Sequence, residues 1–191
     1  MSTGENMDLR VMKTKKNLYE SLLFLMGEHP FEEIKVSEIC EKAMTNRSTF
    51  YAHFEDKYAL LSSLIMDLKT GLTEELLKNE EITNSKEYYL KCLYLLFEHI
   101  EHNKEVYSPL IVNNRNSIAM DMIYDTLLED ITKRMNLEGH DKKRKIPADF
   151  VTHFYLGAIF QIGMKWIQSK NYYSKEEVLS YLEHLIPNDL S

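Results

Sequence analysis

The segment TNRSTFYAHFEDK, residues 45–57, places side chains suited to nucleic-acid recognition beside side chains suited to a protein core. Arg47 can pair with two acceptors of a guanine base, and the hydroxyl groups of Ser48 and Thr49 can bond phosphate oxygens. Phe50 and Phe54 are four residues apart, so on a helix they share one face and can pack on a neighbouring helix. The segment therefore predicts a short helix that presents polar groups outward from a buried aromatic base.

The elements around this segment have the spacing of a helix-turn-helix unit. In that unit the second helix enters the DNA major groove with its N-terminal residues. Asn46 and Asp56 are good N-cap residues for the two helices that follow them. The apolar periodicity predicts helices over 14–27, 36–43 and 47–53, and a longer helix from Lys57.

The rest of the chain also reads as helices joined by short polar breaks. The helical pattern restarts at Ser85 and after Asn103, Asn116, Pro147 and Ser174, and we find no strand alternation. Ser174 with Glu177 forms a capping box, and Pro147 suits the first turn of a helix. The polar stretch 135–145 predicts a mobile loop. The fold class we predict is all-α.

The stretch VSEICEKAMTNRSTFYAHFEDKYALL resembles the DNA-binding domain of TetR/AcrR-type bacterial transcriptional regulators. Tyr51, His53, Phe54 and Lys57 match the hallmark of that family, an aromatic residue, any residue, His-Phe, and then a lysine. The stretch FYLGAIFQIGMKWIQSKNYYSKEEVLSYLEHLI resembles the C-terminal domain of a Gram-positive subgroup of the same family. The resemblance implies a helix-turn-helix domain over 1–56 and a helical effector-binding and dimerisation domain over 57–191.

The resemblance and the residue types together give a set of DNA-contacting residues. Tyr51, His53 and Lys57 are expected on phosphates, and Arg47 with Thr49 on base edges. Two positions depart from the family pattern: Met44 stands where the turn usually has glycine, and Lys35 where a hydroxyl residue usually caps the second helix. The full predicted set is Lys35, Ser37, Thr45, Arg47, Ser48, Thr49, Tyr51, His53 and Lys57.

Two further sites are predicted in the C-terminal domain. The helix over 147–169 is apolar around a wider arc than one intramolecular contact requires. The resemblance implies that this helix and the last helix of each subunit form a four-helix dimer interface. A single buried core helix is the alternative. The predicted interface comprises Phe154, Ala158, Ile162, Trp166, Val178, Leu182 and Leu185. By resemblance, the helices after residue 85 enclose an effector cavity, and its predicted lining is Cys92, Phe97, Tyr107, Tyr124, Phe154 and Gln161.

Composition excludes several classes of protein. The formal net charge of −7 argues against a general polyanion binder, so contact with DNA must be local. No apolar run is long enough for a membrane span, and we expect a cytoplasmic protein. Cys40 and Cys92 make no disulfide framework. His99 and His102 have the spacing of two metal ligands, but a polar helix end explains them better, so we expect no metal, no cofactor and no enzyme activity.

These observations predict a dimeric regulator of transcription that binds a double-stranded operator. A repressor released by a small-molecule effector is the first hypothesis. The alternative is a TetR-like activator or architectural protein controlled by a protein partner, and a simple helical hairpin over 36–54 is the structural alternative. We also expect the helix from Lys57 to be the sole link between the two domains.

Overall fold

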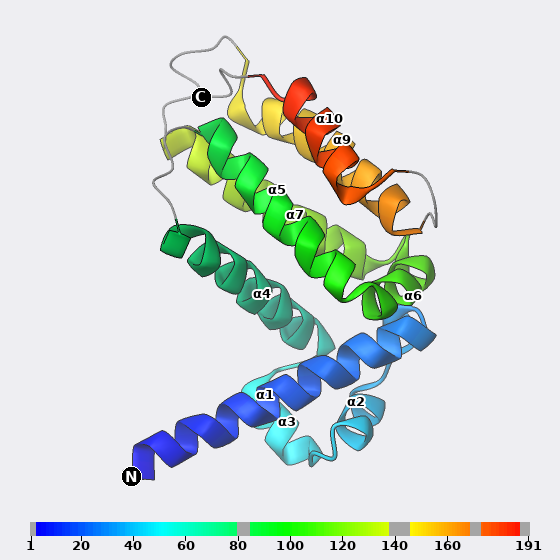
Figure 1. The fold of residues 1–191 in the computed structure, drawn as a ribbon. Coiled ribbons are helices and arrows are strands. Elements are labelled where there is room, and N and C mark those ends of the chain that lie inside the picture. Colours follow the sequence, from blue (N-terminus) through cyan, green and yellow to red (C-terminus); the bar gives the residue numbers. More distant parts are fainter. Residues whose placement is uncertain (1–2, 80–84, 138–145, 169–172, 188–191) are drawn as a thin grey trace.

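A computed structural model describes residues 3–79, 85–137, 146–168 and 173–187, and every regular element in these ranges is a helix (Figure 1). The all-α fold class is therefore confirmed. The elements, in chain order, are α1 (Thr3–Glu28), η1 (Phe31–Glu33), α2 (Val36–Lys42), α3 (Arg47–His53), α4 (Lys57–Asn79), α5 (Ser85–His102), α6 (Lys104–Asn114), α7 (Ile118–Leu137), α9 (Ala148–Gln168) and α10 (Lys175–Leu185).

The N-terminal head consists of α1, η1, α2 and α3. Leu18, Leu22 and Met26 recur every four residues on one face of α1, and all three are buried. They pack in one core with Phe50 of α3 and Leu60 of α4. Apolar side chains from α1, α3 and α4 thus hold the head together around the first helix.

The first helix is longer than its apolar pattern predicts. It begins at Thr3 rather than near Thr14, although Leu9 and Met12 are exposed. Once a helix is nucleated, each further residue adds one backbone hydrogen bond, so it can continue where no side chain is buried. The periodicity of buried residues therefore located the packed part of α1 and missed its exposed start.

Helix ends follow the predicted capping residues in most cases. The Asp56 carboxylate accepts from the Ala59 N–H at 2.8 Å, and Ser174 and Glu177 form both bonds of a capping box, at 3.2 and 2.8 Å. Asn46 occupies the N-cap of α3 but makes no side-chain capping bond. At α2 the Glu38 carboxylate accepts from the Lys35 N–H at 2.6 Å, which is the half of a capping box that the third helical residue supplies.

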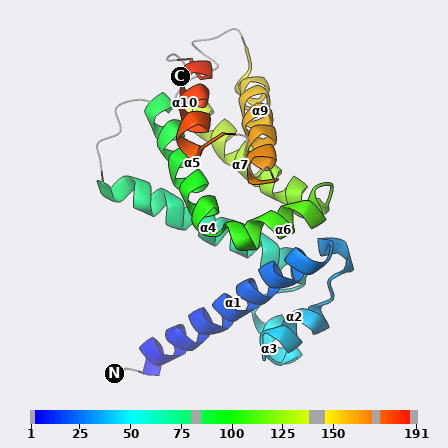
Figure 2. The ribbon, with the colours of Figure 1, turned by 45° about the vertical axis from the view of Figure 1, so that its right-hand side comes forward.

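The C-terminal helices α5, α7, α9 and α10 lie together, and α4 runs between them and the head (Figure 1). The head has a second connection to them, because α6 packs against the C-terminal end of α1 (Figure 2). The prediction that α4 alone joins the two parts is therefore wrong. The sequence could not show this second connection, because a contact such as that between Asn113 and Gly27, 86 positions apart, leaves no local pattern.

Two other predictions concern a loop over 135–145 and the lack of a membrane-spanning helix. The stretch 135–145 starts inside α7, which continues to Leu137, and residues 138–145 lie outside the described residues. No helix in the described part of the chain has both the length and the apolar character that a membrane span needs.

Candidate nucleic-acid interface

The turn between α2 and α3 is tight and left-handed at one residue. The Thr45 N–H donates to the Cys40 carbonyl at 2.9 Å, and the Met44 N–H to the Glu41 carbonyl at 3.1 Å. These bonds require a positive φ at Met44, which is 49°. The position that usually carries glycine thus keeps the glycine conformation with a methionine side chain that is 94% exposed.

Helix α3 has an apolar face and a polar face. Phe50 and Phe54 are buried, with ring centroids 5.8 Å apart, and the Phe54 ring lies 6.3 Å from that of Tyr19 in α1. Arg47 and Tyr51 point the other way and are exposed. The first-turn polar residues are therefore held outward by aromatic packing, as the segment predicts.

A shallow hollow of about 410 Å³ separates the start of α2 from α3. Its polar lining comes from the start of α2, from α3 and from the start of α4, and includes Lys35, Ser37, Arg47, Tyr51 and Lys57. Five predicted DNA-contacting residues thus meet at one concave surface. The other four surround it along the chain without lining it: Thr45, Ser48, Thr49 and His53.

Lys57 is placed differently from the prediction. Its ammonium donates to the carbonyls of Phe31, Glu32 and Ile34, at 2.9, 2.7 and 2.8 Å. An ammonium group has three protons, so these bonds use all of them. Burial lowers the pKa of Lys57, and the nearby carboxylates, Glu32 foremost, act in the opposite direction. The sequence indicated a phosphate contact, whereas in the structure the amine binds backbone carbonyls.

The predicted dimer residues divide into two groups. Phe154, Ala158, Ile162 and Leu185 lie on the outer faces of α9 and α10, and Phe154 and Leu185 are 66% and 67% exposed. The other three are buried inside the protomer: Trp166, Val178 and Leu182. They face inward because α9 and α10 are apolar on two sides, and one side packs on the protein's own core.

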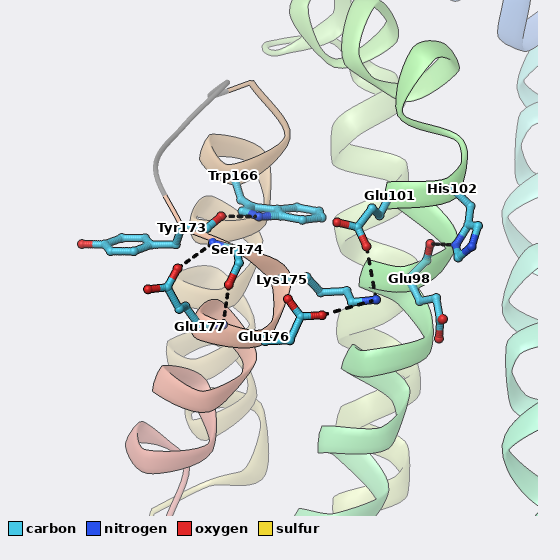
Figure 3. Close-up of polar contacts among 9 residues, drawn as sticks. All are labelled: Glu98, Glu101, His102, Trp166, Tyr173, Ser174, Lys175, Glu176 and Glu177. Carbon is cyan, nitrogen blue, oxygen red and sulfur yellow. Dashed lines mark hydrogen bonds and ion pairs between the residues drawn. The ribbon is translucent and has the colours of Figure 1, made fainter.

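The Trp166 side chain is occupied by contacts within the protomer and is therefore not available to a second subunit. Its ring packs on Phe97 with centroids 4.9 Å apart. Its indole N–H donates to the Tyr173 carbonyl at 3.1 Å (Figure 3). Beside it, the Lys175 ammonium lies 3.2 Å from Glu101 and 3.9 Å from Glu176, which ties α10 to α5. Burial acts to lower the pKa of Lys175, but the bond to Glu101 and the surrounding acidic charge outweigh it and raise that pKa.

The predicted effector-pocket residues also divide. Phe97 is buried, and Cys92, Tyr107 and Tyr124 are half-buried among the C-terminal helices. Phe154 and Gln161 are exposed on the outer face of α9, because residues seven apart share a helix face. These two do not point into the interior of the protomer, so we leave them out of any internal pocket.

His99 and His102 are used in local hydrogen bonds. His99 Nε2 lies 2.8 Å from the Tyr107 hydroxyl, and His102 Nδ1 lies 2.8 Å from the Glu98 carbonyl. Burial lowers the pKa of His99 and raises the pKa of Tyr107. Among the described residues, no group of three or more His, Cys, Asp or Glu side chains is arranged to hold a metal ion.

Comparison with protein families settles the class of this chain. Residues 20–64 match the family described as bacterial regulatory proteins, tetR family, and residues 87–188, more than half of the chain, match the transcriptional regulator C-terminal region. The chain belongs to the TetR family. This TetR-family protein is therefore a DNA-binding regulator of transcription, and the resemblance seen in the sequence is confirmed.

Individual relatives are distant. The chain is 24% identical over 180 residues to the dhaKLM operon transcriptional activator DhaS of Lactococcus lactis, covering 91% of this chain and 88% of that protein. It is 37% identical over 57 residues to the uncharacterized regulator YxbF of Bacillus subtilis, covering 30% of this chain and 15% of YxbF. A TetR regulator structure from Streptococcus agalactiae shares the fold, with a TM-score of 0.66, 24% identity and coverage of 96% and 98% of the two chains.

Sequence reasoning missed several residues of this TetR-family protein that the structure brings forward. Phe150 and Tyr181 add exposed aromatic rings, at 65% and 50%, beside the outer residues of the predicted interface. Asn114 is fully buried and bonded to the head. Phe150 and Phe154 are four residues apart and so share a helix face, which was a usable signal for Phe150, whereas an isolated asparagine gives none.

Proposed function

We propose that this TetR-family protein acts as a homodimer in the cytoplasm and binds a two-fold operator with α3 of each protomer. The observation that carries the proposal is the outward polar face of α3 above its buried Phe50 and Phe54. In this arrangement Arg47 and Thr49 read base edges. Phosphates are contacted by Lys35, Ser37, Thr45, Ser48, Tyr51 and His53.

The dimer part of the proposal rests on exposed apolar side chains of α9 and α10. Phe154 and Leu185 each leave about two thirds of their surface open to solvent, and Phe150 and Tyr181 add exposed rings one turn away on α9 and α10 respectively. Contiguous apolar surface on a soluble protein commonly marks a protein interface. A two-fold pair would set the two α3 helices one DNA turn apart, about 34–36 Å, or allow them to swing to that separation.

We infer a repressor as the first mode of regulation. A dimer bound over a promoter excludes RNA polymerase, and a small molecule that prefers the non-binding conformation releases the DNA. Shifting a population from about 1:99 to 99:1 requires that preference to reach about 5.5 kcal/mol. The half-buried polar tips of Tyr107 and Tyr124, with Cys92 and buried Phe97, are the groups that we assign to effector recognition.

The second mode is an activator controlled by a protein partner. The similarity to DhaS over nearly the whole chain favours activation, since DhaS is named a transcriptional activator. In this mode the DNA-binding surface stays the same and the control signal differs. The sign of regulation is thus independent of the α3 assignment.

Fluorescence anisotropy with the promoter duplex upstream of the gene for this protein tests the DNA-binding proposal. The logarithm of the wild-type affinity should fall linearly with the logarithm of salt concentration, and Arg47→Ala should bind more weakly. The proposal would be contradicted if the wild type bound that duplex no more tightly than random DNA.

Transcription from the same duplex in vitro then separates repression from activation. Native mass spectrometry of the purified protein reveals whether a small molecule is retained.

A further inference from the structure

The short helix η1 is the place where the head meets the rest of the molecule. Two residues separate it from the end of α1 and two from the start of α2, so its position sets where the helix-turn-helix unit starts. Its Phe31 side chain is fully buried. Two polar side chains from distant parts of the chain bind its backbone: Lys57 donates to its carbonyls, and Asn114 accepts from the Phe31 N–H.

Lys57 holds the carbonyl side of this turn. Its ammonium lies within 2.9 Å of three carbonyl oxygens, those of Phe31, Glu32 and Ile34, and 4.9 Å from the centroid of the Phe31 ring. Since the lysine is the first residue of α4, these bonds fasten the start of α4 to η1. A phosphate oxygen could accept a hydrogen bond from this ammonium only by replacing one of the three carbonyl oxygens.

Asn114 holds the amide side of the same turn. It is 0% exposed, its Oδ1 accepts from the Phe31 N–H at 2.6 Å, and its Nδ2 donates to the carbonyls of Met26 and Leu110, both at 2.8 Å. Both Nδ2 protons are thus used, one of them on the last turns of α1. All of these bonds are buried, where an unmade hydrogen bond is costly.

Two further hydrogen bonds connect η1 and the end of α1 to the corner between α6 and α7. Asn113 donates from Nδ2 to the Gly27 carbonyl at 2.6 Å, and the Glu32 carboxylate accepts from the Ile118 N–H at the start of α7 at 2.7 Å. The corner therefore binds both the end of α1 and η1. We call the five side chains and backbone groups around η1, those of Glu32, Phe31, Lys57, Asn113 and Asn114, the η1 joint.

We propose that Lys57 and Asn114 are positioning residues for DNA binding: they fix η1 between α4 and the α6–α7 corner, so that the head and the C-terminal helices move as one body. The proposal rests on the DNA-binding function proposed above for α3. Recognition requires groups such as Arg47 to be held within about 0.5 Å of their productive place. Neither positioning side chain touches the DNA, and a change at the α6–α7 corner reaches α3 without passing along α4.

The salt dependence of DNA binding distinguishes this role from a phosphate contact. A residue that neutralises one phosphate contributes about 0.9 to the slope of log affinity against log salt, whereas a positioning residue contributes nothing to it. Lys57→Met keeps the length of the side chain and removes its donors. We expect this variant to bind the promoter duplex several-fold more weakly with an unchanged slope, and Asn114→Ala to behave alike.

Two variants serve as the positive and the negative control for this measurement. Lys35→Met, on the proposed DNA surface, should lower the slope by about 0.9. Lys133→Met, an exposed lysine of α7, should change neither slope nor affinity. A slope lowered by about one unit in a folded Lys57→Met protein would overturn the positioning role and restore the phosphate contact.

A distance measurement without DNA tests the joint by itself. Spin labels at Ser48→Cys on α3 and Glu129→Cys on α7, in a Cys40→Ala, Cys92→Ala background diluted with unlabelled protein, report the placement of the head within one chain. We expect one narrow distance distribution, broadened or shifted by Lys57→Met and by the milder Asn113→Ala. Distributions that stay narrow and unmoved in both variants would refute the joint, whether or not the wild type binds the duplex.

Discussion

Met44 is held in a backbone conformation that its side chain disfavours. Its φ of 49° closes the turn between α2 and α3, and a non-glycine residue in this region costs about 1–2 kcal/mol. The side chain is almost fully exposed, so no packing offsets that cost. The strain is stored in the turn that sets the angle between the two helices of the DNA-binding unit.

Replacing Met44 should therefore stabilise the protein. Met44→Gly removes the strain and adds some backbone entropy to the unfolded chain, which leaves a net gain of about 0.5–1 kcal/mol. Urea denaturation measures the free energy of unfolding. Glu41→Gly, inside α2, is the matched control and should lose about 1 kcal/mol instead. A loss of stability in Met44→Gly would show that the methionine makes a favourable contact in the turn.

His99 gives the protein a dependence of stability on pH. Burial lowers its pKa below the ordinary value of 6.5, with His102 adding to this effect and Glu75 opposing it. The unfolded chain therefore takes up the proton first as pH falls, and stability should decline progressively below about pH 6.5. Above that value both states hold the neutral imidazole, and this contribution is fully present.

The variant His99→Gln tests this assignment. Glutamine can keep a hydrogen bond to the Tyr107 hydroxyl, which lies 2.8 Å from the imidazole, but it does not titrate. The difference between the denaturation midpoints of wild type and variant should decrease as the pH is lowered from 7 to 5. The other histidines contribute equally to both proteins, so their effects cancel in this difference. A difference that stays constant over this range would mean that His99 titrates alike in the folded and unfolded chains.

At the scale of single elements, Asp56 determines where α4 begins. Its carboxylate accepts from the Ala59 N–H at 2.8 Å, and it lies at the positive end of the helix dipole. Because Lys57 follows immediately, fraying of this turn would also release the carbonyl cage around η1. The cap therefore supports the joint as well as the helix.

We predict that Asp56→Ala lowers the free energy of unfolding by about 1 kcal/mol. Thermal unfolding followed by circular dichroism measures the loss. Glu55→Ala removes the neighbouring exposed carboxylate, which lies outside the capping position, and should be close to neutral. Equal effects of the two substitutions would indicate a general response to lost negative charge rather than a cap.

At the scale of the whole molecule, the outer faces of α9 and α10 expose large apolar side chains to solvent. Trp166, Val178 and Leu182 supply the inner contacts, so a charge introduced at those sites would test folding rather than assembly. Phe154 and Leu185 are exposed and can be changed with little effect on the protomer core. They are the positions at which the proposed dimer can be separated from the fold.

We expect Phe154→Glu and Leu185→Glu to yield folded monomers, because a charge in the middle of an apolar interface loses its hydration on association. Sedimentation velocity at micromolar concentration gives the oligomeric state, and circular dichroism confirms the fold. Val112→Glu, at a 59% exposed site on α6, is the control and should leave assembly unchanged. A monomeric wild type under these conditions would disprove the interface.

Local pattern alone determined most of the architecture. Helix periodicity, the N-cap positions at Asp56 and Ser174, and the spacing of Phe50 and Phe54 depend on residues within a few turns of one another. These signals specify the all-α class, the helix-turn-helix unit and its outward polar face. They are readable because the hydrogen bonds and the helix period that produce them are themselves local.

Only the tertiary structure decided the connections between distant residues. An apolar stripe on two sides of α9 does not reveal which side packs inward, so Trp166 and Phe154 looked alike in the sequence. The Lys57 amine binds carbonyls 23–26 residues away, and Asn114 binds Phe31 across 83 positions. Such bonds depend on how the helices are placed in space, because burial and donor geometry are properties of the packed chain and not of its local order.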